Sequence, residues 1–145
     1  MHPDEVTGVT LELAIAIHRE LGPGLLESVY EAILSYELQK HGYRVRRQQS
    51  MRFKYDGQLF QEAYRADLII EDMVVVEVKS LPKLDPAFTA QLLTYLRLMD
   101  MKSGLLINSG QPTLLAGVKR VVCRLPSFAH SRVRLNQNPS EHRTA

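Results

Sequence analysis

A run of large apolar residues from Met73 to Val76 places the tightest constraint on the fold of this 145-residue chain. Its valine-rich composition favours a β-strand. Because the run is apolar on both faces of such a strand, each face of the sheet must be covered by other elements. The run therefore predicts the central strand of an α/β protein, with helices on both sides of the sheet.

The rest of the chain supplies the helices and further strands. The spacing and type of apolar residues predict helices over about 5–21, 26–41 and 86–100, and strands over about 43–55, 58–70, 73–79, 104–107 and 114–125. Tight turns at Asp56-Gly57 and Glu71-Asp72 join the first three strands into a meander. A strand–helix–strand crossover follows, so we expect a mixed central β-sheet flanked by helices.

Composition and length fit one globular domain. Hydrophobic residues make up 45% of the chain and charged residues 23%, values that are typical of folded rather than disordered proteins. We expect a single domain over residues 1–125 and a polar, flexible tail over residues 126–145.

Other features bear on where the protein is found. Asp4 and Glu5 argue against a signal peptide, and no stretch of about 18 apolar residues occurs that could span a membrane. The single cysteine, Cys123, allows no intramolecular disulfide. We therefore predict a cytoplasmic location and no membrane partner.

Charged residues interrupt the central strand. Glu77 and Lys79 are two residues apart, so their side chains point to the same face. If Glu71-Asp72 forms the turn, Asp67 lies roughly opposite Glu77 on the neighbouring strand. Two carboxylates this close repel each other unless a cation joins them, and hard oxygen ligands favour Mg²⁺ or Mn²⁺. A lysine beside such an ion can act on an attacking water, so this combination indicates metal-assisted phosphodiester hydrolysis.

A structural interpretation of the same residues is also open. Lys79 could form a surface salt bridge with Glu77 or Asp67 on a strand that is exposed on one face. The apolar run before Glu77 and the aspartate opposite favour the metal site over this alternative.

Basic residues are concentrated on the strand predicted over 43–55. Between Leu38 and Tyr55 every charged residue is lysine or arginine. Such a zone can contact the phosphates of nucleic acid, and the alternative is a solvated strand surface. The residues that we expect to bind nucleic acid are Arg44, Arg46, Arg47, Arg52 and Lys54.

Several motifs resemble a known family. Asp67, nine intervening residues and Glu77-Val78-Lys79 resemble the signature of the PD-(D/E)XK nuclease superfamily, with Ala66 in place of its proline. The segment 91–95 resembles the glutamine-to-tyrosine motif of the RecB-like branch. The segment 24–30 resembles the motif that names the bacterial GxxExxY protein family. Together the resemblance spans roughly residues 5–124 and implies a restriction-endonuclease-like core.

The resemblance also implies roles for the charged residues of the central strand. Asp67 and Glu77 would bind Mg²⁺ or Mn²⁺, helped by the carbonyl of Val78. Lys79 would act on the attacking water. These roles come from the likeness to the superfamily and not from the spacing of the residues.

Three helical residues receive roles in the same way. Glu27 would complete or support a second metal position, Gln91 would orient the lysine or the substrate phosphate, and Tyr95 would pack beneath the site or touch the nucleic-acid backbone. The alternatives are an acid that is favoured at a helix N-terminus for Glu27 and a solvated side chain for Gln91.

The predicted function is a Mg²⁺-dependent nuclease that acts on DNA. The alternative is a module on the same fold that binds nucleic acid or a protein without cutting. A hydrolase of small phosphoesters is less favoured, since the chain has no glycine-rich phosphate loop. A chain of this size offers little surface for recognition, which leaves a homodimer or a helper protein open.

Overall fold

The computed structural model of the chain describes residues 1–126 and 133–136. Its elements are α1 (Pro3–Leu21), α2 (Glu27–Lys40), β1 (Val45–Tyr55), β2 (Gln58–Ile70), β3 (Val74–Lys79), α3 (Pro86–Met99), β4 (Ser103–Asn108), the 3₁₀ turn η1 (Leu115–Gly117), β5 (Val118–Val122) and β6 (Val133–Asn136). Up to β5 this is the predicted order of elements. None of the helices in the described ranges is long and apolar enough to cross a membrane.

The strands form one mixed sheet in the order β5-β4-β3-β2-β1-β6. β1, β2 and β3 are an antiparallel meander. β3 and β4 are parallel, and α3 is the crossover between them. The prediction of a mixed α/β sheet flanked by helices is therefore confirmed.

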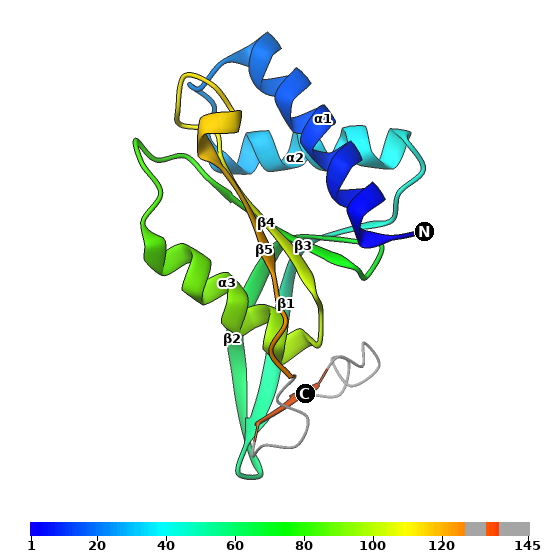
Figure 1. The fold of residues 1–145 in the computed structure, drawn as a ribbon. Helices are drawn as coiled ribbons and strands as arrows, with labels where there is room; N and C mark the ends of the chain where they lie inside the picture. The colour runs from blue at the N-terminus through cyan, green and yellow to red at the C-terminus, as the bar shows by residue number, and fades with distance from the viewer. Residues whose placement is uncertain (127–132, 137–145) are drawn as a thin grey trace.

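Each face of the sheet packs against its own apolar core. The core beneath α1 and α2 contains Val74, Val76 and Val78 of β3. The core beneath α3 contains Val75 of β3 together with Leu106 of β4. Figure 1 shows α1 and α2 together on one side of the sheet and α3 on the other. This burial on both faces explains why β3 is apolar except at Glu77 and Lys79.

β1 and β2 form a long hairpin that extends beyond β3 (Figure 1). Its turn is the predicted Asp56-Gly57, and both residues have positive φ, as tight hairpin turns require. β2 pairs with β1 along nearly its whole length, but it pairs with β3 only over residues 68–70. The part of β2 before Leu68 can therefore diverge from β3, and the candidate site lies at this point.

The C-terminal elements differ from the expected ones. The strand predicted over 114–125 is shorter, because Leu114 to Gly117 turn through η1 before β5 begins. Residues 133–136 form β6, which pairs with β1 and which the sequence pattern did not predict. The remaining residues of the predicted tail, 127–132 and 137–145, lie outside the described residues.

Candidate active site

Asp67 lies where β2 and β3 separate. Backbone pairing between these strands ends at Leu68, opposite Val76. One residue further, the Oδ2 atom of Asp67 accepts a hydrogen bond of 2.8 Å from the backbone N–H of Val78. The side chain of Asp67 thus supplies the acceptor that the diverging backbone of β2 no longer offers, and it bridges the two strands.

The backbone is irregular around Asp67. Regular alternation along β2 would place Ala66 on the same face as Leu68. Instead Ala66 belongs to the core beneath α3, and Leu68 belongs to the core beneath α1 and α2. On the neighbouring strand, Gln48 has a φ of 50°, which is uncommon for any residue other than glycine. Both strands therefore depart from regular β geometry where Asp67 reaches β3.

Glu77 is a buried carboxyl group, with only 8% of the residue exposed. Its Oε1 atom accepts a hydrogen bond from the hydroxyl of Tyr64, and the backbone N–H of Asp67 also donates to it. Burial and, next, the charge of Asp67 raise the pKa of Glu77 to about 8, although Tyr64 and Lys79 oppose this rise. Glu77 therefore keeps its proton at neutral pH in this arrangement.

Lys79 is the last residue of β3 and shares a face with Glu77, as predicted. Its Nζ atom lies 4.8 Å from the centroid of the Phe88 ring on α3, in a cation–π contact. Among the described residues, no salt bridge joins Lys79 to Glu77 or Asp67. The surface-salt-bridge interpretation finds no support in these contacts.

The end of β4 fixes the chain that follows Lys79. The carbonyl of Lys79 accepts a 2.9 Å hydrogen bond from the backbone N–H of Ser109. The fully buried Asn108 donates to the carbonyl of Leu81 and accepts from its N–H, each at 2.9 Å. The backbone of Lys79 is therefore held firmly at the carboxyl ends of two parallel strands, where open α/β sheets usually bind their ligands.

The chain as a whole can be compared with known proteins. Residues 4–121 match the PD-(D/E)XK nuclease superfamily. The chain belongs to the PD-(D/E)XK nuclease superfamily. A search of curated proteins and a search of solved structures each found no match. Because the family match covers the central strands and nearly all of both cores, it agrees with the restriction-endonuclease-like core that the resemblance implied.

In this PD-(D/E)XK chain, the first turn of α2 brings Glu27 to the end of β3. The Oε1 atom of Glu27 accepts a 2.9 Å hydrogen bond from the backbone N–H of Ser80, the residue after Lys79. Glu27 is exposed. The structure thus brings Glu27 to the Lys79 end of the site, although the two segments lie far apart in the sequence.

Gln91 and Tyr95 lie on α3, on the side of the sheet that Glu77 faces. The rings of Tyr95 and Tyr64 are stacked with their centroids 3.4 Å apart, and the side chain of Gln91 forms a hydrogen bond with Tyr95. Burial and the charge of Glu77 raise the pKa of Tyr64, so its hydroxyl stays a donor. A series of contacts through Tyr95 and Tyr64 therefore connects Gln91 to Glu77.

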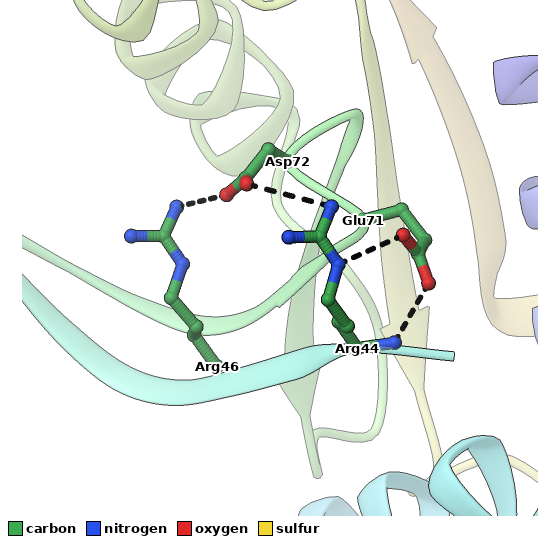
Figure 2. Close-up of polar contacts among 4 residues, drawn as sticks. All are labelled: Arg44, Arg46, Glu71 and Asp72. Carbon is green, nitrogen blue, oxygen red and sulfur yellow. Dashed lines mark hydrogen bonds and ion pairs between the residues drawn. The ribbon is translucent and has the colours of Figure 1, made fainter. Parts of the chain in front are cut away.

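The first two basic residues of the β1 region contact acids of the β2–β3 turn. Figure 2 shows Arg44 beside Glu71 and Asp72, and Arg46 beside Asp72. The Nε atom of Arg44 lies 3.2 Å from Glu71, and its backbone N–H donates to the same carboxylate at 2.7 Å. These contacts, the backbone hydrogen bond above all, lower the pKa of Glu71. Both arginines thus stabilise a turn in which Glu71 and Asp72 have positive φ.

The other basic residues of β1 have different neighbours. The Nε atom of Arg47 lies 3.3 Å from Oε1 of Glu31 on α2. Arg52 and Lys54 lie further along the hairpin, in the stretch of β1 that pairs with β6. Of the predicted nucleic-acid-binding residues, Arg44, Arg46 and Arg47 are thus paired with acidic residues of the chain.

Sequence reasoning missed Glu31, Gln48 and Tyr64. The Nε2 atom of Gln48 donates to Oε2 of Glu31 at 2.8 Å and to Oδ1 of Asp67 at 3.2 Å. The one available signal for Glu31 is its position one helical turn after Glu27. The position of Gln48 follows from its unusual backbone angle, which the sequence does not reveal.

The donors at this site fit a hard divalent cation. Asp67 lies close enough to Glu77 for its charge to raise the pKa of Glu77. A cation between the two carboxylates relieves such repulsion. Mg²⁺ and Mn²⁺ prefer oxygen ligands, and Mg²⁺ usually keeps several waters. No group of three or more His, Cys, Asp or Glu in the described part of the chain could form a metal site. The protein therefore offers two carboxylates, not a complete cage.

Proposed function

We propose that this protein is a Mg²⁺- or Mn²⁺-dependent nuclease that hydrolyses phosphodiester bonds of DNA. The observation that carries the proposal is that Asp67 and Lys79 both lie near Glu77, at the carboxyl end of β3. Membership of the PD-(D/E)XK nuclease superfamily supports the same chemistry. The active unit would be one domain over residues 1–125.

Asp67 and Glu77 would hold the cation, together with the carbonyl of Val78. When bound, a divalent cation would stabilise negative charge on the phosphate and make a bound water more acidic. Tyr64 would fix the carboxyl group of Glu77 through its hydroxyl. Lys79 would orient the attacking water from its position at the end of β3.

Residues around this centre would bind the substrate. Glu27 would complete or support a second metal position beside Ser80. Gln91 would orient Lys79 or the substrate phosphate, and Tyr95 would pack beneath the site or touch the nucleic-acid backbone. Further phosphates would be contacted by the basic residues Arg44, Arg46, Arg47, Arg52 and Lys54. Those that now pair with an acidic residue of the chain would give up that ion pair to bind a phosphate.

The proposal includes a finer place within the superfamily. Gly24, Glu27 and Tyr30 carry the pattern of the bacterial GxxExxY family, and Gln91 and Tyr95 carry the RecB-like pattern. A cytoplasmic location, and a homodimer or a helper protein that enlarges the binding surface, belong to the same proposal.

One observation favours a binding module that does not cut. Both oxygens of Asp67 already accept hydrogen bonds, from the backbone of Val78 and from the side chain of Gln48. A carboxylate occupied in this way could serve to hold β2 and β3 together. The two functions are separated by whether the protein cleaves nucleic acid when a divalent cation is added.

The test compares wild type with Lys79→Ala on supercoiled plasmid, linear duplex, single-stranded DNA and RNA, each with Mg²⁺, Mn²⁺ or EDTA. We expect cleavage of DNA that requires the cation and that falls by about 100-fold or more in Lys79→Ala. The matched control is Lys83→Ala, because Lys83 is an exposed lysine in the loop after β3 and should keep full activity.

Equal cleavage by wild type and by a pure, folded preparation of Lys79→Ala would refute the role given to the lysine. If nothing is cut while Mn²⁺ still binds, a helper protein or another substrate becomes the favoured explanation. If the protein neither cuts nor binds Mn²⁺, the binding module is the correct function.

A further inference from the structure

The side chain of Gln48 lies between two carboxylates that come from different elements. Its single Nε2 atom donates to Glu31 on α2 at 2.8 Å and to Asp67 on β2 at 3.2 Å. An amide nitrogen carries two hydrogens, so it can serve both acceptors at once. The opposite orientation would place the amide oxygen against two carboxylates, so the chemistry of the neighbours fixes the side chain as a donor to both.

Glu31 is a firm anchor for this side chain. It is only 3% exposed, and its other carboxylate oxygen lies 3.3 Å from the Nε atom of Arg47. A buried carboxylate needs such partners, because an unpaired charge in the interior is costly. With Arg47 on one oxygen and Gln48 on the other, Glu31 ties the amide of Gln48 to the body of α2.

The backbone at Gln48 adopts a conformation that is unusual for glutamine. Its φ of 50° lies in the left-handed region, which glycine and asparagine adopt more readily than glutamine. Backbone strain of this kind persists where the surroundings enforce it and is often found at functional sites. A glutamine at this position keeps an amide long enough to reach both carboxylates, which a shorter side chain would not.

We propose that Gln48 is a positioning residue that orients the carboxylate of Asp67 for metal-dependent cleavage. Val78 holds Oδ2 through its backbone N–H, and Gln48 holds Oδ1. Two contacts on different oxygens fix the plane of the carboxylate, whereas one contact would leave it free to turn. Each oxygen keeps a lone pair for a further ligand. The inference rests on the proposed function, since the reaction is what would use this orientation.

The test uses two substitutions of Gln48 and one matched control. Gln48→Met keeps the length of the side chain and removes its donors. Gln48→Asn suits the left-handed backbone better but shortens the amide. Gln49→Met makes the same chemical change one residue along β1, where Gln49 bonds only the carbonyl of Ser50 in the contacts described.

The measurements are Mn²⁺ affinity by calorimetry, kcat and KM for DNA cleavage, and the melting temperature in EDTA. We expect Gln48→Met and Gln48→Asn to weaken Mn²⁺ binding and to lower kcat by about 10- to 100-fold each. The KM for DNA should not change, because Gln48 is assigned no contact with the substrate. Gln49→Met should match wild type in both Mn²⁺ affinity and kcat.

A charge exchange separates positioning from a structural role. Gln48→Glu sets three carboxylates together and should lower the melting temperature in EDTA. The double variant Glu31→Gln with Gln48→Glu restores a donor and an acceptor between these two positions, so the melting temperature should return toward wild type. Its kcat should stay low, because the carboxylate introduced at position 48 would repel that of Asp67 in place of holding it.

Wild-type Mn²⁺ affinity and kcat in Gln48→Met would overturn the inference, as would recovery of kcat in the double variant. If wild type binds Mn²⁺ but cuts none of the substrates, a helper protein or another substrate is the favoured explanation, and Mn²⁺ affinity still decides the role of Gln48. If wild type neither cuts nor binds Mn²⁺, both proposals are wrong.

Discussion

At the scale of single residues, the buried carboxyl group of Glu77 links the site to the stability of the fold. Burial and the charge of Asp67 raise its pKa from 4.5 to about 8 in the folded protein. Between these values the unfolded chain releases a proton that the folded protein keeps, so the stability of wild type falls as the pH rises toward 8. Below about pH 4.5 both states carry the proton, and the stabilisation from this group is then complete.

Glu77→Gln removes this titration and retains an acceptor for Tyr64. In EDTA, we expect the variant and wild type to have similar stability near pH 4. Near pH 8 the variant should be more stable, by a difference on the order of a few kcal/mol. Urea denaturation across this pH range measures the difference. A gap that did not widen with pH would contradict the raised pKa. Tyr64→Phe should move the pH dependence of stability to higher pH, because the hydroxyl of Tyr64 lowers the pKa of Glu77.

The sequence was sufficient to predict Asp67, Glu77 and Lys79 as neighbours. Two of them interrupt an apolar strand at a spacing of two, and the turn at residues 71–72 fixes the partner of the third. Glu31 and Gln48 could not be found in this way. Their contact depends on the left-handed backbone conformation of Gln48 within β1. The spacing of apolar residues, which predicts strands and helices, gives no signal for such a conformation.

At the scale of elements, the close contact between the segments that follow β3 and β4 should depend on a glycine. A Cβ atom at Gly110 would lie 2.5 Å from the carbonyl oxygen of Leu81 and 2.6 Å from its nitrogen. Leu81 cannot move away without losing its two hydrogen bonds with Asn108. We therefore expect Gly110→Ala to lower the free energy of unfolding by about 1–3 kcal/mol.

Gly8→Ala is the matched control for Gly110→Ala. Gly8 lies inside α1, and no atom of the residues that the structure describes lies within 4 Å of an added Cβ atom. Alanine is the better helix former, so this variant should raise the free energy of unfolding by about 0.5–1 kcal/mol. Urea denaturation of both proteins gives the comparison. Equal stability of the two variants would show that the backbones at Gly110 and Leu81 are not in close contact.

Element order was predictable because each element carries its own period, whereas some boundaries depend on tertiary contacts. β5 begins later than predicted because the chain first turns through η1. The point where β2 leaves β3 depends on the competition between the side chain of Asp67 and a backbone acceptor. The apolar pattern of β2 continues past that point and does not indicate it.

At the scale of the whole molecule, the two cores meet at the central sheet and hold the site between them. Val78 packs in the core beneath α1 and α2, while Glu77 shares the α3 side with Tyr64. A cation that joins Asp67 to Glu77 would therefore link β2 to β3 at the point where their backbone pairing has ended. Cation binding should for this reason stabilise the fold as a whole.

Mn²⁺ should thus raise the melting temperature of wild type. A ligand at about 100 times its dissociation constant stabilises a folded protein by about 2.7 kcal/mol, which corresponds to a rise of roughly 5–15 °C for a domain of this size. Asp67→Asn should lose most of this rise, because an amide binds a divalent cation poorly. Asp72→Asn is the control, since Asp72 pairs with Arg46 at the β2–β3 turn. A thermal melt with increasing Mn²⁺ makes the comparison, and an equal rise in both variants would place the cation away from Asp67.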